Sequence, residues 1–211
     1  SKNSFTFLFI KVVIIASGAK PKTLGVANEG RLRGRGVSYC ATCDGFFFKD
    51  QPVAVVGGGD TAVEEAMYLT KMCSSVTLIH RRDALRANRT AQNRAMNNDK
   101  LHILYDTVVD DIIGEDKVTQ LSLKNVKTEE TTTLDVNGVF IFVGYSPNGS
   151  FLPDDLAVDS HGYIITNEEM ETNLPGVFAI GDVRQKKLRQ VTTAVGDGGA
   201  VMHAVEEYLR D

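Results

Sequence analysis

Two cysteines separated by two residues are the most reactive group in this sequence of 211 residues. The run Cys40-Ala-Thr-Cys43 could form a two-electron redox couple or supply half of a zinc site. Zinc would need two further Cys or His ligands, and only Cys73 and four scattered histidines remain. The spacing therefore favours a redox couple, and we interpret Cys73, on an apolar helix face, as a small core residue.

Asp44 directly follows the second cysteine. Thiol–disulfide exchange needs one thiolate as the attacking group and a proton source for the departing sulfur. A neighbouring carboxyl group could supply or remove that proton. Asp44 could equally serve only as the N-cap of a helix, and the residues alone leave both roles open.

A glycine turn follows the cysteines, and Gly57-x-Gly59-x-x-Ala62 fits the G-x-G-x-x-G/A pattern of dinucleotide sites. The first glycine permits a tight turn, the second lets a pyrophosphate approach the backbone, and Ala62 allows close helix packing. Free amides at the start of the helix would then meet the phosphates. The pattern is weak by itself, because an ordinary tight turn between a strand and a helix has the same residues.

The next predicted strand ends in a basic cluster, His80, Arg81 and Arg82, with Arg86 a helical turn beyond. An NAD site usually has an acidic residue there, about twenty residues after the glycines, to bind the ribose 2′-hydroxyl. Guanidinium groups pair instead with a 2′-phosphate. A basic run could also be a solvated turn, but its position after the second strand favours NADPH over NADH.

The two motifs together imply a third component, because a hydride from NADPH does not normally reduce a disulfide directly. A flavin, FAD or FMN, is the usual intermediary. The segment 177–182 ends in Gly181-Asp182 and is a candidate to hold it. A strand ending in this way can bring backbone near a pyrophosphate and a carboxylate near a ribityl hydroxyl, although the same residues occur in ordinary turns.

The elements that must position these residues alternate between strand and helix, which predicts an α/β fold. A loop is expected over 20–36 and short β-like runs over 101–134. Apolar runs predict buried strands, and amphipathic or Ala-rich spacing predicts helices after the glycine turn, around 85–97 and over 191–209. The predicted strands are 12–16, 53–56, 76–79, 139–143 and 177–180.

Composition excludes several classes of function. A net charge of -4 gives no reason to expect nucleic acid or an anionic membrane surface. The apolar run 5–15 is interrupted by Lys11 and is too short to span a bilayer. Three cysteines are too few for a secreted disulfide scaffold, so a reducing compartment, the cytoplasm, is expected.

Taken jointly, the motifs resemble the low-molecular-weight thioredoxin reductases. They fall in that family's order and cover nearly the whole chain from about Val12 onward. The segments that carry the resemblance are Cys40-Ala-Thr-Cys-Asp-Gly-Phe-Phe-Phe, the turn 57–62, His80-Arg-Arg-Asp, Phe178-Ala-Ile-Gly-Asp-Val and Arg189-Gln-Val-Thr-Thr-Ala.

The resemblance implies a thioredoxin-disulfide reductase that passes electrons from NADPH through FAD to a Cys40–Cys43 disulfide and on to thioredoxin. It implies a Rossmann-like, three-layer NADPH-binding domain at 23–144, inserted in an FAD-binding domain split between 1–22 and 145–211. The family rotates one domain against the other, with joints expected near 22–24 and 144–147. A complete enzyme of this kind is a homodimer.

Residue roles also follow from the resemblance. Cys43 would be the flavin-side sulfur, Cys40 would attack thioredoxin, and Asp44 would be the acid–base group. The basic cluster, His80, Arg81, Arg82 and Arg86, would bind the 2′-phosphate. The other cofactor-binding residues would be Gly57, Gly59, Asp60, Thr61, Ala62, Gly144, Gly181, Asp182, Arg189, Gln190 and Val191.

The chain departs from the family at its start. Nothing before Val12 supplies the strand and glycine turn that hold the adenosine half of FAD, and Ser17 stands where the family usually has Thr. We therefore expect a fragment that lacks on the order of a hundred residues and binds FAD poorly.

One alternative function is a nucleotide-binding remnant without turnover. Another is a flavoprotein of the alkyl hydroperoxide reductase type, which usually prefers NADH; the basic cluster argues against it.

Overall fold

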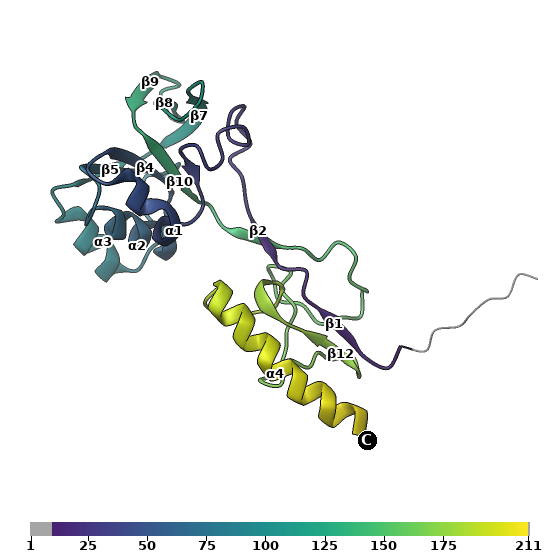
Figure 1. Cartoon of the computed structure of the whole chain (residues 1–211). Coiled ribbons are helices and arrows are strands. Elements are labelled where there is room, and N and C mark those ends of the chain that lie inside the picture. Colours follow the sequence, from purple (N-terminus) through teal and green to yellow (C-terminus); the bar gives the residue numbers. More distant parts are fainter. Residues whose placement is uncertain (1–9, 211) are drawn as a thin grey trace, which may run out of the picture. The chain divides into compact units, whose positions relative to one another are not determined.

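A computed structural model describes residues 10–210 of the chain, so the first part of the apolar run 5–15 lies outside the described residues. The chain divides into two compact units (Figure 1). One unit comprises 21–144, and the other combines the segment that ends at Lys20 with the segment from Tyr145 onward.

The unit 21–144 is built on a five-stranded sheet in which every neighbouring pair of strands is parallel. Across the sheet the order is β3 (Val37–Ser38), β10 (Gly138–Phe142), β4 (Pro52–Gly57), β5 (Ser75–Ile79) and β6 (Leu101–Leu104). Strands β3 and β6 are therefore the edges, and β3 has only two residues.

Successive residues of the central strand β4 enter different cores, because side chains alternate along a strand. Val53 and Val55 pack in the core that holds the buried face of helix α2 (Asp60–Leu69). Ala54 and Val56 pack in the core formed with an antiparallel sheet. That sheet consists of β7 (Thr107–Ile113), β8 (Gln120–Asn125) and β9 (Thr131–Asp135).

The unit therefore has three layers: helices, the parallel sheet and the antiparallel sheet, with the helices and β7–β9 on opposite sides (Figure 1). The predicted short strands between 101 and 134 are confirmed. The helix layer consists of α1 (Ala41–Asp44), the 3-10 turn η1 (Gly45–Phe48), α2 and α3 (Arg89–Met96).

Helix α3 begins later than the sequence predicts. The prediction started the helix near residue 85, whereas Asn88 is its N-cap and accepts a hydrogen bond from the Ala91 amide at 2.9 Å. Arg86 is therefore in the loop before α3, not within a helical turn. The buried Leu85 and Ala87 explain the error, because apolar residues of a loop imitate the apolar face of a helix.

The second unit contains two small sheets and a long helix. Strand β1 (Val13–Ile15) pairs in parallel with β12 (Val177–Ala179). Strand β2 (Ala19–Pro21) pairs with β11 (Tyr145–Pro147), so the segment predicted as a loop begins in a strand. The 3-10 turn η2 (Gly181–Val183) and helix α4 (Val191–Arg210) complete the unit. In both units, no helix among residues 10–210 is long and apolar enough to cross a membrane.

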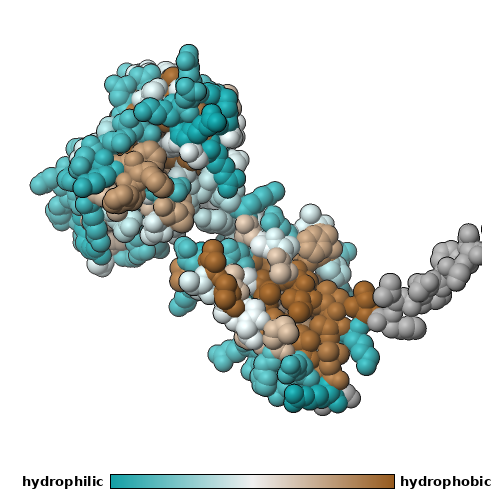
Figure 2. Space-filling model, viewed as in Figure 1, coloured by the Kyte–Doolittle hydropathy of each residue, from teal (hydrophilic) through white to brown (hydrophobic). Residues whose placement is uncertain are grey.

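The strand predicted over 12–16 is present but is not buried throughout. Val13 is 43% exposed and Ile14 is 40% exposed, and Ile15 is buried. The reason is that β1 belongs to a sheet of only two strands, so much of its surface is uncovered. Figure 2 shows apolar residues gathered on the surface of this unit.

Candidate functional site

The turn from β4 into α2 leaves open space over its last glycine. At Gly57, with φ +154°, a Cβ atom would lie 2.6 Å from the Ala62 Cβ and from the Phe142 carbonyl oxygen. At Gly59, the N-cap of α2, a Cβ atom would meet nothing within 4 Å. The first glycine is therefore required for packing, whereas the space at Gly59 would admit a ligand to the backbone.

His80 supports this turn from inside the protein. Its side chain is 5% exposed, and a Cβ atom on Gly58 would lie 2.2 Å from the imidazole ring. The Nε2 atom lies 3.0 Å from the Ala84 carbonyl oxygen. Burial lowers the pKa of His80, which favours the neutral ring at pH 7. This geometry indicates a supporting role for His80 rather than direct contact with a phosphate.

The three arginines are exposed around a cleft at the carboxyl ends of β4 and β5. The cleft has a volume of about 450 Å³, and Arg81 and Arg86 are among its lining residues. Arg82 is exposed in the same loop, and among residues 10–210 none of the three forms an ion pair with a carboxylate. Three guanidinium groups without acidic partners can bind an anion.

The loop that carries the arginines is fixed to the glycine turn by two contacts that the sequence did not predict. The Arg86 amide donates to the Gly58 carbonyl oxygen at 2.7 Å. Asn88 donates both its backbone N–H and its Nδ2 to Asp60 Oδ1, each at 2.7 Å. These two bonds lower the pKa of Asp60, the first residue of α2. The sequence offered one signal for this contact: Asn is a common N-cap, so Asn88 could have been predicted to begin the helix.

Cys40 and Cys43 form a disulfide, with their Cα atoms 5.3 Å apart. Cys40 is the N-cap of α1, and its Sγ atom accepts the Cys43 amide at 3.2 Å. Cys43 is exposed and Cys40 is half-buried. The amide of Cys43 is thus placed to stabilise a thiolate on Cys40 after reduction.

Helix α1 packs directly on α2, the helix that starts at the glycine turn. Ala41 belongs to the same buried core as Ala62 and Ala66. A Cβ atom on Gly45 would lie 2.9 Å from Leu69 Cδ2, so glycine at this position permits close approach. The disulfide and the glycine turn are therefore held by one packed pair of helices.

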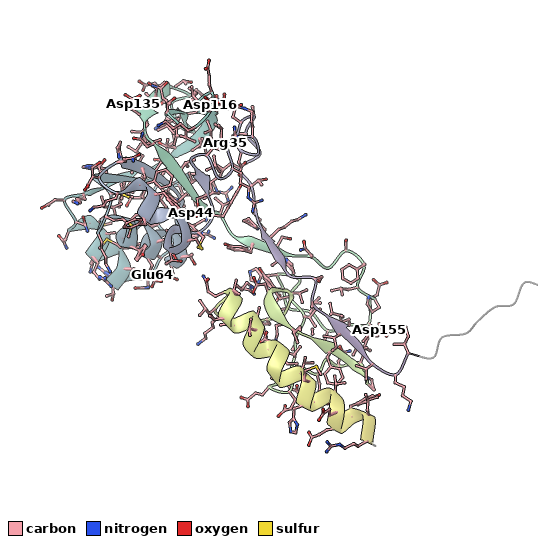
Figure 3. The ribbon with its side chains drawn as sticks, viewed as in Figure 1. Arg35, Asp44, Glu64, Asp116, Asp135 and Asp155 are labelled. Atoms are coloured by element: carbon pink, nitrogen blue, oxygen red, sulfur yellow. A yellow bond between two sulfur atoms is a disulfide. The ribbon has the colours of Figure 1, made fainter. Side chains whose placement is uncertain are left out.

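The carboxyl group of Asp44 binds a residue of a strand rather than a helix end. Figure 3 labels Asp44 in the unit 21–144. Ser38 Oγ donates to Asp44 Oδ2 at 2.6 Å. Asp44 occupies the N-cap position of η1 but makes no capping hydrogen bond with its side chain, so the capping role considered for it is wrong. Ser38, 4% exposed, was not predicted from the sequence, because a serine six residues upstream carries no recognisable signal.

The third cysteine takes no part in this arrangement. Cys73 is fully buried in the core, which confirms its predicted role as a small core residue, and burial raises its pKa to about 11. Its predicted place on a helix face is wrong: α2 ends at Leu69, and Cys73 lies in the bend before β5, where its burial imitates the apolar spacing of a helix. Among residues 10–210 no group of three or more His, Cys, Asp or Glu side chains could hold a metal ion.

Two large apolar side chains follow the disulfide without being buried. Phe46 is 75% exposed and Phe47 is 74% exposed, whereas the third member of the run, Phe48, packs edge-to-face on Phe140 at 5.4 Å. Exposed phenylalanines next to each other are typical of a contact surface. The sequence motif includes these residues but does not show which of them faces outward.

The predicted flavin contacts lie in the second unit. Asp182 Oδ1 is a buried oxygen without a hydrogen-bond partner in the described structure, which a hydroxyl donor would satisfy. Arg189 lies over the Tyr163 ring at 3.8 Å and donates from Nε to the Asp182 carbonyl oxygen at 3.3 Å. Gln190 and Val191 are exposed where α4 begins.

Gly181 is held by a carboxylate of α4. Its amide donates to Asp197 Oδ2 at 2.8 Å, and Lys186 Nζ binds the same oxygen at 2.7 Å. Arg184 binds the other oxygen of this buried carboxylate at 3.3 Å. The Gly181 amide is therefore already bonded, and the contribution of this glycine is its φ of +72°. Gly144 lies at the end of the other unit, where its carbonyl oxygen accepts the Lys22 amide at 2.9 Å.

Comparison with known proteins supports this description. Thioredoxin reductases of Peptoclostridium litorale and Listeria innocua are 46% and 48% identical to the chain over 207 and 203 residues, each 95% of this chain. The chain spans 66% and 63% of those relatives, slightly less than two thirds of their length. The crystal structure of a thioredoxin reductase from Streptococcus pyogenes is 54% identical, with a TM-score of 0.87 over 94% of this chain and 65% of that one.

The likeness to that structure confirms the predicted α/β fold. The model of the pyridine nucleotide-disulphide oxidoreductase family matches residues 2–198, most of the sequence. A disulfide on one helix and a glycine turn at the start of the next agree with both terms of that description. The chain belongs to the pyridine nucleotide-disulphide oxidoreductase family.

Proposed function

We propose that this chain functions in the NADPH-dependent reduction of thioredoxin, with FAD as the second cofactor. One observation carries the proposal: the Cys40–Cys43 disulfide and the glycine turn are attached to the packed helices α1 and α2 of a single unit. On this proposal 23–144 is the NADPH-binding domain, and 1–22 and 145–211 belong to the FAD-binding domain. The complete enzyme would be a cytoplasmic homodimer.

The residues around the glycine turn fit NADPH. Open space at Gly59 would admit the pyrophosphate, and the first amides of α2, at Asp60 and Thr61, would bind it. The guanidinium groups of the loop before α3, Arg81, Arg82 and Arg86, would pair with the 2′-phosphate. His80 would hold the turn in place.

The residues of the second unit fit a flavin at one position in particular. The buried Asp182 Oδ1 needs a donor, and a ribityl hydroxyl would provide one. Gln190 and Val191, exposed at the start of α4, would lie along the ring system. A bound flavin would supply the two-electron link between a nicotinamide and a disulfide.

The dithiol would then perform exchange with thioredoxin. Cys40, whose Sγ accepts the Cys43 amide, would attack one sulfur of the thioredoxin disulfide and break that bond. Asp44 would give a proton to the departing sulfur. Cys43 would next attack Cys40, which reforms the intramolecular disulfide and releases thioredoxin with two thiols. Phe46 and Phe47, exposed beside the disulfide, would contact thioredoxin.

Cofactor preference tests this proposal against the alternative of an alkyl hydroperoxide reductase flavoprotein. Isothermal titration of the chain with NADPH and NADH should show tighter binding of NADPH. Replacing both Arg81 and Arg82 by Ala should weaken NADPH binding by at least about a hundredfold and leave NADH within about threefold, because charged hydrogen bonds contribute roughly 1.5–3 kcal/mol each.

A matched control is Arg94→Ala, which removes an exposed arginine from α3 away from the turn. It should leave the affinity for both nucleotides unchanged. Equal losses of NADPH and NADH in the double variant would remove the 2′-phosphate assignment. Tighter binding of NADH by the unmodified chain would favour the alternative.

A further inference from the structure

Ser38 lies in the strand that precedes the dithiol and binds the carboxyl group that follows the dithiol. Its hydroxyl donates to Asp44 Oδ2 at 2.6 Å and accepts the Cys40 amide at 3.1 Å. The Cys40 carbonyl oxygen lies 3.3 Å away as a second possible acceptor. The side chain is 4% exposed, so water does not compete freely for these bonds.

The position of Ser38 is fixed by the sheet. Ser38 belongs to β3, which pairs with β10 in the register Phe140↔Ser38. Phe140 is fully buried, so this pairing is part of the core. The hydroxyl is therefore fixed by the pairing of β3 with β10, whereas Asp44 lies at the end of a helix of four residues.

A hydroxyl has one proton to donate and two lone pairs to accept, and Ser38 can use them in two ways. When Asp44 is ionised, Ser38 donates to Oδ2 and accepts the Cys40 amide. When Asp44 is protonated, its O–H can donate to Ser38 Oγ, while the Ser38 hydroxyl turns to the Cys40 carbonyl oxygen. Ser38 thus keeps a hydrogen bond to Asp44 in both protonation states.

We propose that Ser38 is a positioning residue that holds the Asp44 carboxyl group beside the dithiol while that group gains and loses a proton. The inference rests on the proposed function, in which Asp44 protonates the departing sulfur. In that step the Cys40 thiolate forms a bond to one sulfur of a disulfide, the disulfide bond breaks, and the departing thiolate takes the proton from Asp44. The departing sulfur becomes a thiol and Asp44 becomes a carboxylate.

Ionisable side chains besides Asp44 lie on an element packed against α1. Helix α1 packs on η1 and α2, and η1 carries no titratable side chain. The titratable residues of α2 are Asp60, Glu64, Glu65 and Tyr68. Of these, Glu65 is half-buried with a raised pKa, caused first by burial and then by Glu64. These side chains are the same in every Ser38 variant, so the variants are compared at one pH.

The test uses the reduced chain and two small disulfides. Hydroxyethyl disulfide releases a basic alkyl thiolate that needs a proton, whereas Ellman's reagent releases a stable aromatic thiolate that does not. Ser38→Ala should slow the reaction with hydroxyethyl disulfide by about tenfold, part of the roughly hundredfold or more that general acids contribute. The rate with Ellman's reagent should change by less than about threefold, and Ser38→Thr should restore the alkyl rate.

A double-mutant cycle separates this role from general damage. In the Asp44→Asn background, which is already slow, adding Ser38→Ala should have little further effect on the alkyl rate. An equal loss in both backgrounds would overturn the proposal, because Ser38 would then act through the Cys40 amide or through folding. Ser75→Ala, in β5, is the control and should leave both rates unchanged.

The cycle also separates two kinds of failure. If Asp44→Asn does not slow the alkyl reaction, the acid–base role of Asp44 in the proposed function is wrong. If Asp44→Asn slows it and Ser38→Ala does not, only the positioning role of Ser38 is wrong. Rescue adds a further readout: a Ser38→Thr variant as slow as Ser38→Ala with hydroxyethyl disulfide would count against the proposal.

Discussion

Gly58 and Gly59 are neighbours in the sequence, but their surroundings differ. A methyl group on Gly58 would collide with the His80 ring, whereas a methyl group on Gly59 would point into open space. Gly58→Ala should therefore destabilise the unit by about 1–3 kcal/mol, as overpacking does. Gly59→Ala should leave stability nearly unchanged but weaken NADPH binding, because the methyl group would occupy the space near the backbone.

Chemical denaturation and nucleotide titration of the two variants check this prediction, and each variant is the control for the other. The interpretation of the turn would be wrong if Gly59→Ala bound NADPH as tightly as the unmodified chain. The sequence pattern assigns a role to Gly57 and to Gly59 but none to Gly58, which lies between them. The contact between Gly58 and His80 joins two elements, so no local pattern could predict it.

At the scale of the elements, the joint between α2 and α3 depends on Asn88. This side chain caps α3 at the Ala91 amide and donates from Nδ2 to Asp60 at the start of α2, and the Asn88 backbone N–H donates to the same Asp60 oxygen. Asn88→Ala should lower the free energy of unfolding by about 1–2 kcal/mol, the usual range for loss of an N-cap. It should also weaken NADPH binding, because the loop with the arginines would lose one anchor.

Asn97→Ala is a suitable control for this prediction. Asn97 lies at the other end of α3, and its Nδ2 binds only the Asn93 carbonyl oxygen of the same helix among the described residues. Unfolding monitored by circular dichroism should give a smaller loss for Asn97→Ala than for Asn88→Ala. Equal losses without an effect on nucleotide binding would show that Asn88 does not position the arginines.

The same elements show how far the sequence could predict the fold. Strands β4, β5 and β10 are short apolar runs with clear ends, and they form close to the predicted residues. The start of α3 was predicted too early, because the bonds that delay the helix come from Gly58 and Asp60 on another element. The exposure of Val13 and Ile14 was missed for a related reason: burial depends on how many strands cover them.

At the scale of the whole molecule, the two units present different parts of the proposed chemistry. The unit 21–144 holds the disulfide, the glycine turn and the arginines, and the other unit holds Asp182 with its unsatisfied oxygen. The family resemblance implied an NADPH-binding domain at 23–144 between two parts of an FAD-binding domain, and these functions of the two units stay a prediction. The sequence could not predict Ser38 or the direction of the Asp44 carboxyl group, because these depend on the pairing of β3 with β10.

Covalent trapping of thioredoxin tests the central claim most directly. The partner would be a thioredoxin with one active-site cysteine, activated as a mixed disulfide with thionitrobenzoate. The chain with Cys43→Ser retains Cys40 and should form a one-to-one disulfide adduct, visible on a non-reducing gel. Cys40→Ser should form roughly tenfold less, because the Cys43 amide, which donates to the Cys40 sulfur, would stabilise a thiolate at that position. A faster reaction of Cys40→Ser, or equal trapping of an unrelated activated protein, would contradict thioredoxin reduction through Cys40.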